Sequence, residues 1–214
     1  MANSILPPQT YQQEKKCANL TNRALCSPSK AIMKFYNEET DRKFNSDLQQ
    51  QIDGTLPLKH TYQLGEASEI LQSAGIPKLM IILEAGTLRR KSKQDNHLFD
   101  LKDVKNLPSA VQNPLAVFDS RTVKGNYVII TEITRSDKNF IVALEANRAN
   151  RSISVNSIRS IYPRDDKQML KDIISGCILY ADKNKMANLL ANPRFHYEGG
   201  SEVSQARDIV SNLI

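Results

Sequence analysis

The spacing of apolar residues along the chain predicts helices on both sides of a central run of strands. Residues 1–27 mix Pro, Gln, Asn and Lys without a period, which predicts a flexible lead. An apolar stripe from Lys30 and the polar stretch that follows it predict one long, mostly solvated helix ending near Asp53-Gly54. Helical spacing also relates the apolar residues between Leu64 and Ala74, and Gly75-Ile76-Pro77 supplies a stop.

The strands are predicted from runs of branched and aromatic residues. Leu79–Leu83 is an apolar run typical of a buried strand. Four further runs are separated by turns short enough for an antiparallel meander. These runs are Leu115–Phe118, Tyr127–Ile133, Phe140–Glu145 and Ile153–Tyr162, the last of which alternates less regularly than the others.

Further helices flank the meander. A short helix is expected to close at Pro108, and others are expected from Asp165 to Gly176, over 183–190 and over 201–214. Helices, then a run of strands, then helices predict an α+β fold in which the antiparallel sheet is segregated from the helices.

The character of the sequence changes at Leu56-Pro57 and again at Pro193. We therefore expect three parts. Residues 1–55 form a flexible or helical segment for docking or delivery, residues 56–192 form the main domain, and residues 193–214 form a C-terminal helix.

Charge points to the kind of partner. The chain has 29 Lys and Arg residues and 23 Asp and Glu residues. Residues 56–192 contain 20 of these basic residues and 14 of the acidic ones, so the whole basic excess lies in the main domain. A basic domain between nearly neutral flanks favours a polyanionic partner such as RNA. An ordinary solvated basic surface is the alternative on charge alone.

Several classes of protein are not indicated. No run of 18 apolar residues predicts a membrane span, and the N-terminus lacks the pattern of a secretory signal. The expectation is a cytoplasmic protein, or one exported into a target cell by a signal-independent or phage route. Three cysteines, Cys17, Cys26 and Cys177, have neither disulfide-framework nor zinc spacing. Phosphate-loop, dinucleotide and nucleophile-elbow motifs are missing as well, so no cofactor and no metal are expected.

Three groups of residues suggest chemistry on RNA. Metal-free cleavage needs a base for the 2′-hydroxyl, an acid for the leaving 5′-oxygen, and cations or hydroxyls around phosphorus. Histidine suits the proton transfers at neutral pH. The groups are His97 with Arg90 and Lys91; Ser120, Arg121 and Thr122; and Asn156, Ser157, Ser160 and Tyr162. Taken singly, each of these residues is more often a surface residue than a catalyst.

An ordered set of segments resembles the phage MuF C-terminal-type domains, which are grouped with the barnase/EndoU/colicin/RelE-like nucleases. The segments are LGEASEILQSAGIP at 64–77, KSKQDNHLF at 91–99, LPSAVQNPLAVFDSRT at 107–122, YVIITEI at 127–133, VNSIRSIYPRDD at 155–166 and ILYADKNK at 178–185.

The resemblance implies N-terminal helices packed on a four-stranded antiparallel sheet whose face binds RNA, in a toxin or effector domain. It implies His97 as the acid or base, with a phosphate contact from Lys91. Ser160 and Tyr162 join the catalytic set, and the implied substrate contacts are Arg90, Ser120, Arg121, Asn156 and Lys183. Tyr180 and Lys183 match in a segment that also suits a structural role. A second histidine is missing from the pattern, which leaves the second proton-transfer group open.

These features favour a metal-independent ribonuclease that forms a 2′,3′-cyclic phosphate, with tRNA among the candidate substrates. A toxin of this kind needs an immunity or antitoxin protein, expected to be acidic. Two alternatives stay open. One is a non-catalytic module that binds nucleic acid or protein on the same scaffold, and the other is an NAD-dependent RNA-modifying transferase.

Overall fold

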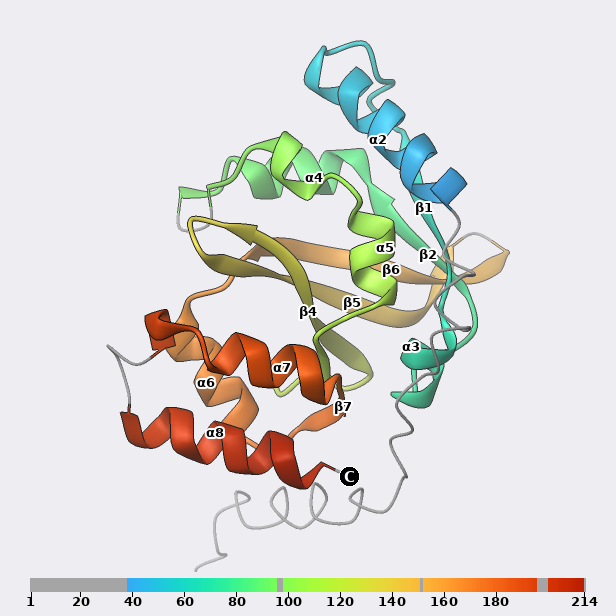
Figure 1. Ribbon diagram of the computed structural model, residues 1–214. Coiled ribbons are helices and arrows are strands. Elements are labelled where there is room, and N and C mark those ends of the chain that lie inside the picture. The colour runs from blue at the N-terminus through green and yellow to red at the C-terminus, as the bar shows by residue number, and fades with distance from the viewer. Residues whose placement is uncertain (1–37, 96–97, 151, 196–199, 214) are drawn as a thin grey trace, which may run out of the picture.

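The computed structural model describes residues 38–95, 98–150, 152–195 and 200–213 of the chain (Figure 1). Within this part, seven strands form one sheet that carries helices on both faces. The strands are β1 Thr61–Glu66, β2 Met80–Glu84, β3 Ala116–Asp119, β4 Asn126–Arg135, β5 Lys138–Asn150, β6 Ile153–Pro163 and β7 Ile178–Ala181.

The sheet is larger than the four-stranded antiparallel sheet that the sequence resemblance implies. Its order is β1-β2-β6-β5-β4-β3-β7, so the expected antiparallel meander β3 to β6 forms its middle. β2 adds to this meander in parallel with β6, β1 pairs antiparallel with β2, and β7 pairs antiparallel with β3 at the other edge. The fold is therefore α+β, but its sheet is mixed.

The prediction of a helix from Leu64 to Ala74 is wrong over its first turn. Tyr62 and Leu64 are buried while Thr61 and Gln63 are exposed, which is the two-residue period of a strand. Gly65 has φ +87° where the register with β2 shifts, a backbone conformation that glycine adopts without strain. The helix that remains, α3, covers only Glu69–Ser73.

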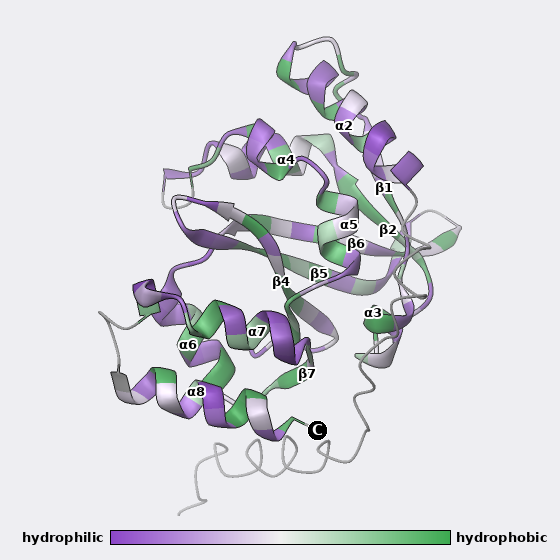
Figure 2. Cartoon of the chain, viewed as in Figure 1, coloured by the Kyte–Doolittle hydropathy of each residue, from purple (hydrophilic) through white to green (hydrophobic). Residues whose placement is uncertain are grey.

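Helices pack on the first face of the sheet over the larger of two hydrophobic cores. These are α2 Glu38–Ile52, α3, α4 Ala85–Ser92, the 3-10 helix η4 Leu101–Val104 and α5 Leu107–Gln112. α2 is largely hydrophilic, as expected of a solvated helix, and it buries Phe44 and Leu48 against this core (Figure 2). Pro108 lies in the first turn of α5 rather than closing a helix, because a helix tolerates proline where no intrahelical N–H bond is required.

Helices on the second face cover only part of it. They are α6 Asp166–Ile174, α7 Lys183–Leu190, the 3-10 helix η5 Pro193–Phe195 and α8 Gly200–Asn212, close to the positions expected from the sequence. The smaller core lies between these helices and the side of the sheet formed by β7, β3 and β4, together with one end of β5 and β6 (Figure 1). No helix of the described residues is long and apolar enough to span a bilayer.

One buried amide ties α5 to β1. Gln112 is fully buried, and its amide donates to the carbonyl oxygens of Leu64 and Glu66, both at 2.9 Å. Its Oε1 accepts from the backbone N–H of Ser68 at 2.8 Å. These bonds satisfy backbone groups at the irregular end of β1, where the sheet does not pair them all.

We expect Gln112→Met to lower the free energy of unfolding by about 2–4 kcal/mol, because one buried and two partly buried backbone groups lose this partner. Denaturant unfolding followed by circular dichroism measures the effect. Gln50→Met, on the exposed side of α2, is the matched control and should change stability by less than about 0.5 kcal/mol. Equal effects of the two substitutions would contradict the structural role of Gln112.

Candidate functional site

Two irregularities in the β5–β6 pairing determine which side chains lie on the uncovered part of the second face. In β6, Ile158 and Ile161 both belong to the larger core although they are three residues apart. Strict alternation would put them on opposite faces. Ala143 pairs with Ser160 and Leu144 pairs with Ile158, so Arg159 is an extra, unpaired residue. This bulge places Arg159 and Ser160 together on the second face.

A second bulge lies in β5. Glu145 pairs with Ser157 and Arg148 pairs with Val155, so β5 has one residue more than β6 over this interval. Asn147 lies at this bulge and has φ +53°, a conformation that asparagine tolerates better than most residues. As a result Glu145 and Arg148 lie on the same face, and Arg148 Nη1 donates to Ser157 Oγ at 3.1 Å.

The bulges produce a charged row across the second face, formed by Arg159, Glu145, Arg148 and Glu84. Arg159 Nε and Arg148 Nε lie 3.4 and 3.8 Å from Glu145 Oε2, and Arg148 Nη1 lies 3.6 Å from Glu84 Oε1. About a third to a half of each side chain is exposed. Such exposed ion pairs contribute little to stability, so the groups can exchange partners with a charged ligand.

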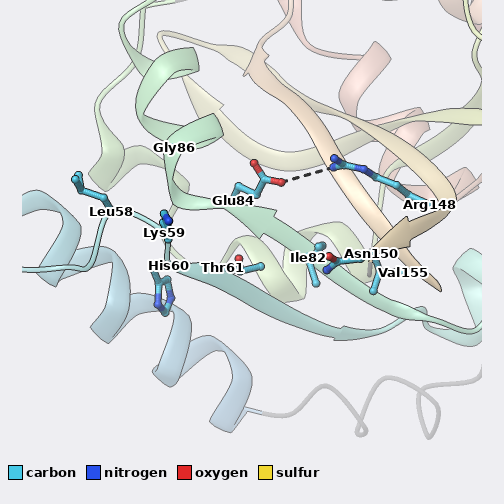
Figure 3. A pocket seen from close by; sticks show the side chains of 10 residues that line it. All are labelled: Leu58, Lys59, His60, Thr61, Ile82, Glu84, Gly86, Arg148, Asn150 and Val155. Atoms are coloured by element: carbon cyan, nitrogen blue, oxygen red, sulfur yellow. Dashed lines mark ion pairs between the residues drawn. The ribbon is translucent and has the colours of Figure 1, made fainter. Parts of the chain in front are cut away.

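A cavity of about 330 Å³ lies at the β1–β2 end of the charged row (Figure 3). Ile82 and Val155 give it an apolar wall, and Glu84 and Arg148 face each other at its edge. Asn150 adds a side-chain amide. Apolar walls with a few polar groups at the edge are typical of small-ligand sites.

His60 lies between this cavity and a smaller one of about 220 Å³ next to α2. Its ring is turned toward α2, with Nε2 3.2 Å from Asp47 Oδ2 (Figure 3). It also packs edge-on against Tyr62, with ring centroids 4.9 Å apart. No local pattern indicated this pair, because Asp47 lies in α2 and His60 directly precedes β1.

A third cavity, of about 320 Å³, brings together Ser120, Arg121 and Tyr162, which the sequence had placed in two separate groups. Arg121 Nη2 lies 2.8 Å from Asp172 Oδ1, and Arg164 Nη2 lies 2.6 Å from Asp172 Oδ2. Arg164 Nη1 also donates to the Tyr162 hydroxyl at 3.3 Å. We call this the arginine-pair cavity. Neither Arg164 nor Asp172 was singled out in the sequence.

Among the remaining expected site residues, Ser160 lies on the same face of the sheet as Tyr162. Asn156 is fully buried, and its amide donates to the Pro77 carbonyl at 2.8 Å. Its Oδ1 accepts from Asn147 N–H at 3.2 Å, so the side chain holds the β5 bulge.

The other expected residues lie elsewhere. Arg90 and Lys91 are on α4, which packs on the first face, opposite Ser160 and Tyr162. Lys183 begins α7 and donates to the Ser211 carbonyl in α8 at 3.1 Å. Tyr180 is buried, and burial, followed by the charge of Asp182, raises its pKa to about 12. His97 lies outside the described residues, as does the N-terminal segment up to residue 37.

The architecture defines an α+β protein whose half-covered mixed sheet carries a charged row and two ligand-sized cavities. Residues 88–188 match the family model of the phage MuF C-terminal domain. This match agrees with the family that the ordered segments indicated. No curated protein and no solved structure matches the chain. The matched stretch contains β3 to β7, whereas β1 and β2 precede it.

We expect Asn156→Ala to destabilise the fold by about 1–3 kcal/mol, because the partly buried hydrogen bonds to the Pro77 carbonyl and the Asn147 N–H are lost. Thermal unfolding followed by circular dichroism measures the effect. Asn188→Ala, on the exposed side of α7, is the control and should change stability by less than about 0.5 kcal/mol. A loss no larger than that of the control would contradict the structural role of Asn156.

Proposed function

We propose that the protein is a metal-independent endoribonuclease whose RNA substrate lies across the uncovered part of the second face. The observation that carries the proposal is the position of Glu145, whose carboxylate lies between the guanidinium groups of Arg148 and Arg159 on an accessible sheet surface. The base and the cations are two of the three kinds of group that cleavage without a metal requires.

In the proposed reaction, Glu145 takes the proton of a ribose 2′-hydroxyl as that oxygen attacks phosphorus. The bond from phosphorus to the 5′-oxygen breaks, giving a 2′,3′-cyclic phosphate and a 5′-hydroxyl end. Arg148 and Arg159 stabilise the charge that develops on the phosphoryl oxygens. The 5′-oxygen must also receive a proton. His97 is the acid that the sequence suggests for this step, although α4 before it and η4 after it pack on the first face.

Two further features support an RNA substrate. The basic excess of the chain lies within residues 56–192, which include the entire sheet. The hydroxyls of Ser120 and Tyr162 line the same cavity as Arg121 and Arg164, and Ser160 lies on the same face of β6 as Tyr162. Such groups commonly bind phosphate oxygens. We extend the proposal to a toxin or effector role with an acidic immunity protein that covers this face.

Glu145→Gln should reduce RNA cleavage by about 10²–10⁴-fold, since the amide cannot accept the 2′-hydroxyl proton. End-mapping of total RNA incubated with EDTA measures the loss and identifies the cyclic phosphate. Glu132→Gln is the matched control, because Glu132 lies on β4 with its carboxylate 2.9 Å from Lys185 Nζ, away from the charged row. His97→Ala, tested in parallel, should also lose activity.

Four results would overturn the proposal. Full activity of Glu145→Gln would exclude Glu145 as the base, and activity that EDTA abolishes would exclude the metal-free mechanism. RNA binding with no product under any condition would indicate a binding module, whereas consumption of labelled NAD in the presence of RNA would indicate a transferase.

Arg148→Gln and Arg159→Gln should each weaken binding of an uncleavable 2′-O-methyl RNA. Each should also lower the slope of log affinity against log salt by about 0.7, the value for one phosphate contact on a single strand. Fluorescence anisotropy between low and physiological salt measures the slope. Arg42→Gln, on the outer side of α2 with 72% of its side chain exposed, should leave it unchanged. Unchanged slopes for the sheet variants would place the RNA elsewhere.

A further inference from the structure

We infer that the arginine-pair cavity binds one ribonucleotide of the RNA, adjacent to the phosphodiester that is cleaved. This inference rests on the proposed function for its biological meaning, although nucleotide binding itself can be measured without cleavage. The cavity, about 320 Å³ in volume, falls at the small end of the range for ligand sites.

The floor of the cavity is apolar and is built from the sheet. Four side chains on neighbouring strands form it: Phe118 from β3, Val128 from β4, and Ile141 and Ala143 from β5. Tyr162, from β6, adds an aromatic ring beside them. A pleated surface of this kind is broad and nearly flat, which suits the face of a base and its ribose better than a compact anion.

The rim of the cavity is cationic. Arg121 and Arg164 share the single carboxylate of Asp172, so one positive charge is left over. Asp119 also lines the cavity, but both arginines pair with Asp172. Val117 lies in the larger core and Phe118 in the smaller one, so alternation along β3 directs the carboxylate of Asp119 toward the first face.

The hydroxyls of the rim add to this cationic site. Ser120 Oγ and Thr122 Oγ1 lie 3.3 Å apart in the β3–β4 connection, next to Arg121. Guanidinium groups flanked by hydroxyls are the usual partners of a phosphate. The cavity therefore offers an apolar floor for a nucleoside and a polar, cationic rim for its phosphate.

The cavity adjoins the charged row. Ala143 forms part of the floor, and Glu145 follows two residues later on the same strand and the same face. Two residues of a strand span about 7 Å. A nucleotide with one phosphate on the arginine pair therefore lies close enough for its neighbouring phosphodiester to extend toward Glu145.

Titration of the full chain with ribonucleoside 5′-monophosphates, followed by backbone amide NMR shifts and by calorimetry, tests the inference. We expect saturable binding with shifts at residues 120–122 and 141–143, and at least tenfold weaker binding of inorganic phosphate. Arg121→Gln removes the more exposed arginine, and Ala143→Leu fills the floor. Each should weaken nucleotide binding at least tenfold, with unfolding temperatures recorded to confirm that the variants fold.

Glu145→Gln separates this inference from the proposed function, because it should abolish cleavage while nucleotide binding persists. Arg42→Gln is again the neutral control. Shifts that cluster instead around Ile82 and Glu84 would overturn the inference, as would nucleotide binding that neither Arg121→Gln nor Ala143→Leu weakens. Equal affinity for inorganic phosphate would reduce the cavity to a simple anion site and would overturn the nucleotide assignment.

Discussion

The pairing of the two longest strands, β5 and β6, is the constraint on which both faces of the molecule depend. Successive side chains of a strand point to opposite faces, so each extra residue reverses every position beyond it. The extra Arg159 in β6 allows Ile158 and Ile161 to lie in the same core. Without it, Ile161 would exchange faces with Ser160 and Tyr162. Full burial of an isoleucine side chain contributes about 1.5–3 kcal/mol, so the core itself holds this bulge in place.

The same constraint explains why the charged groups meet. The bulge in β5 places Arg148 on the face of Glu145, and Asn156 supports it from the interior through the N–H of Asn147. The charged row is thus fixed by core packing and by a buried amide, although its own ion pairs are exposed. Positioning groups through rigid strands rather than loops favours precise geometry at a site.

The sequence predicts the meander well and the site only in part. Branched residues and short turns predict strands β3 to β6, because their burial is a property of local patterning. The uneven spacing of Ile158 and Ile161 is visible in the sequence, but a bulge and a misplaced strand end give the same spacing. Partners such as Asp172 for Arg121, or Asp47 for His60, depend on long-range packing that no local pattern encodes.

The position of β1 shows a second limit of prediction from local sequence patterns. Leu64 fits a strand period with Tyr62, two positions before it, and a helical period with Ala67, three positions after it. Its pairing with β2 decides the outcome, and β2 itself joins the sheet only through its parallel contact with β6. Such non-local pairing is set by the whole fold.

The two ligand-sized cavities differ in how much of their lining falls within residues 88–188, which match the family model. All the residues that line the arginine-pair cavity fall within residues 88–188, so a domain of this length contains them in full. The cavity beside Glu84 takes its apolar wall from Ile82 outside the match and Val155 inside it. The charged row joins the two, since Glu84 precedes the match and its partner Arg148 lies within it. β1 and β2 therefore extend the second face of the sheet beyond the matched residues, and they do so through the parallel β2–β6 contact that also completes the sheet.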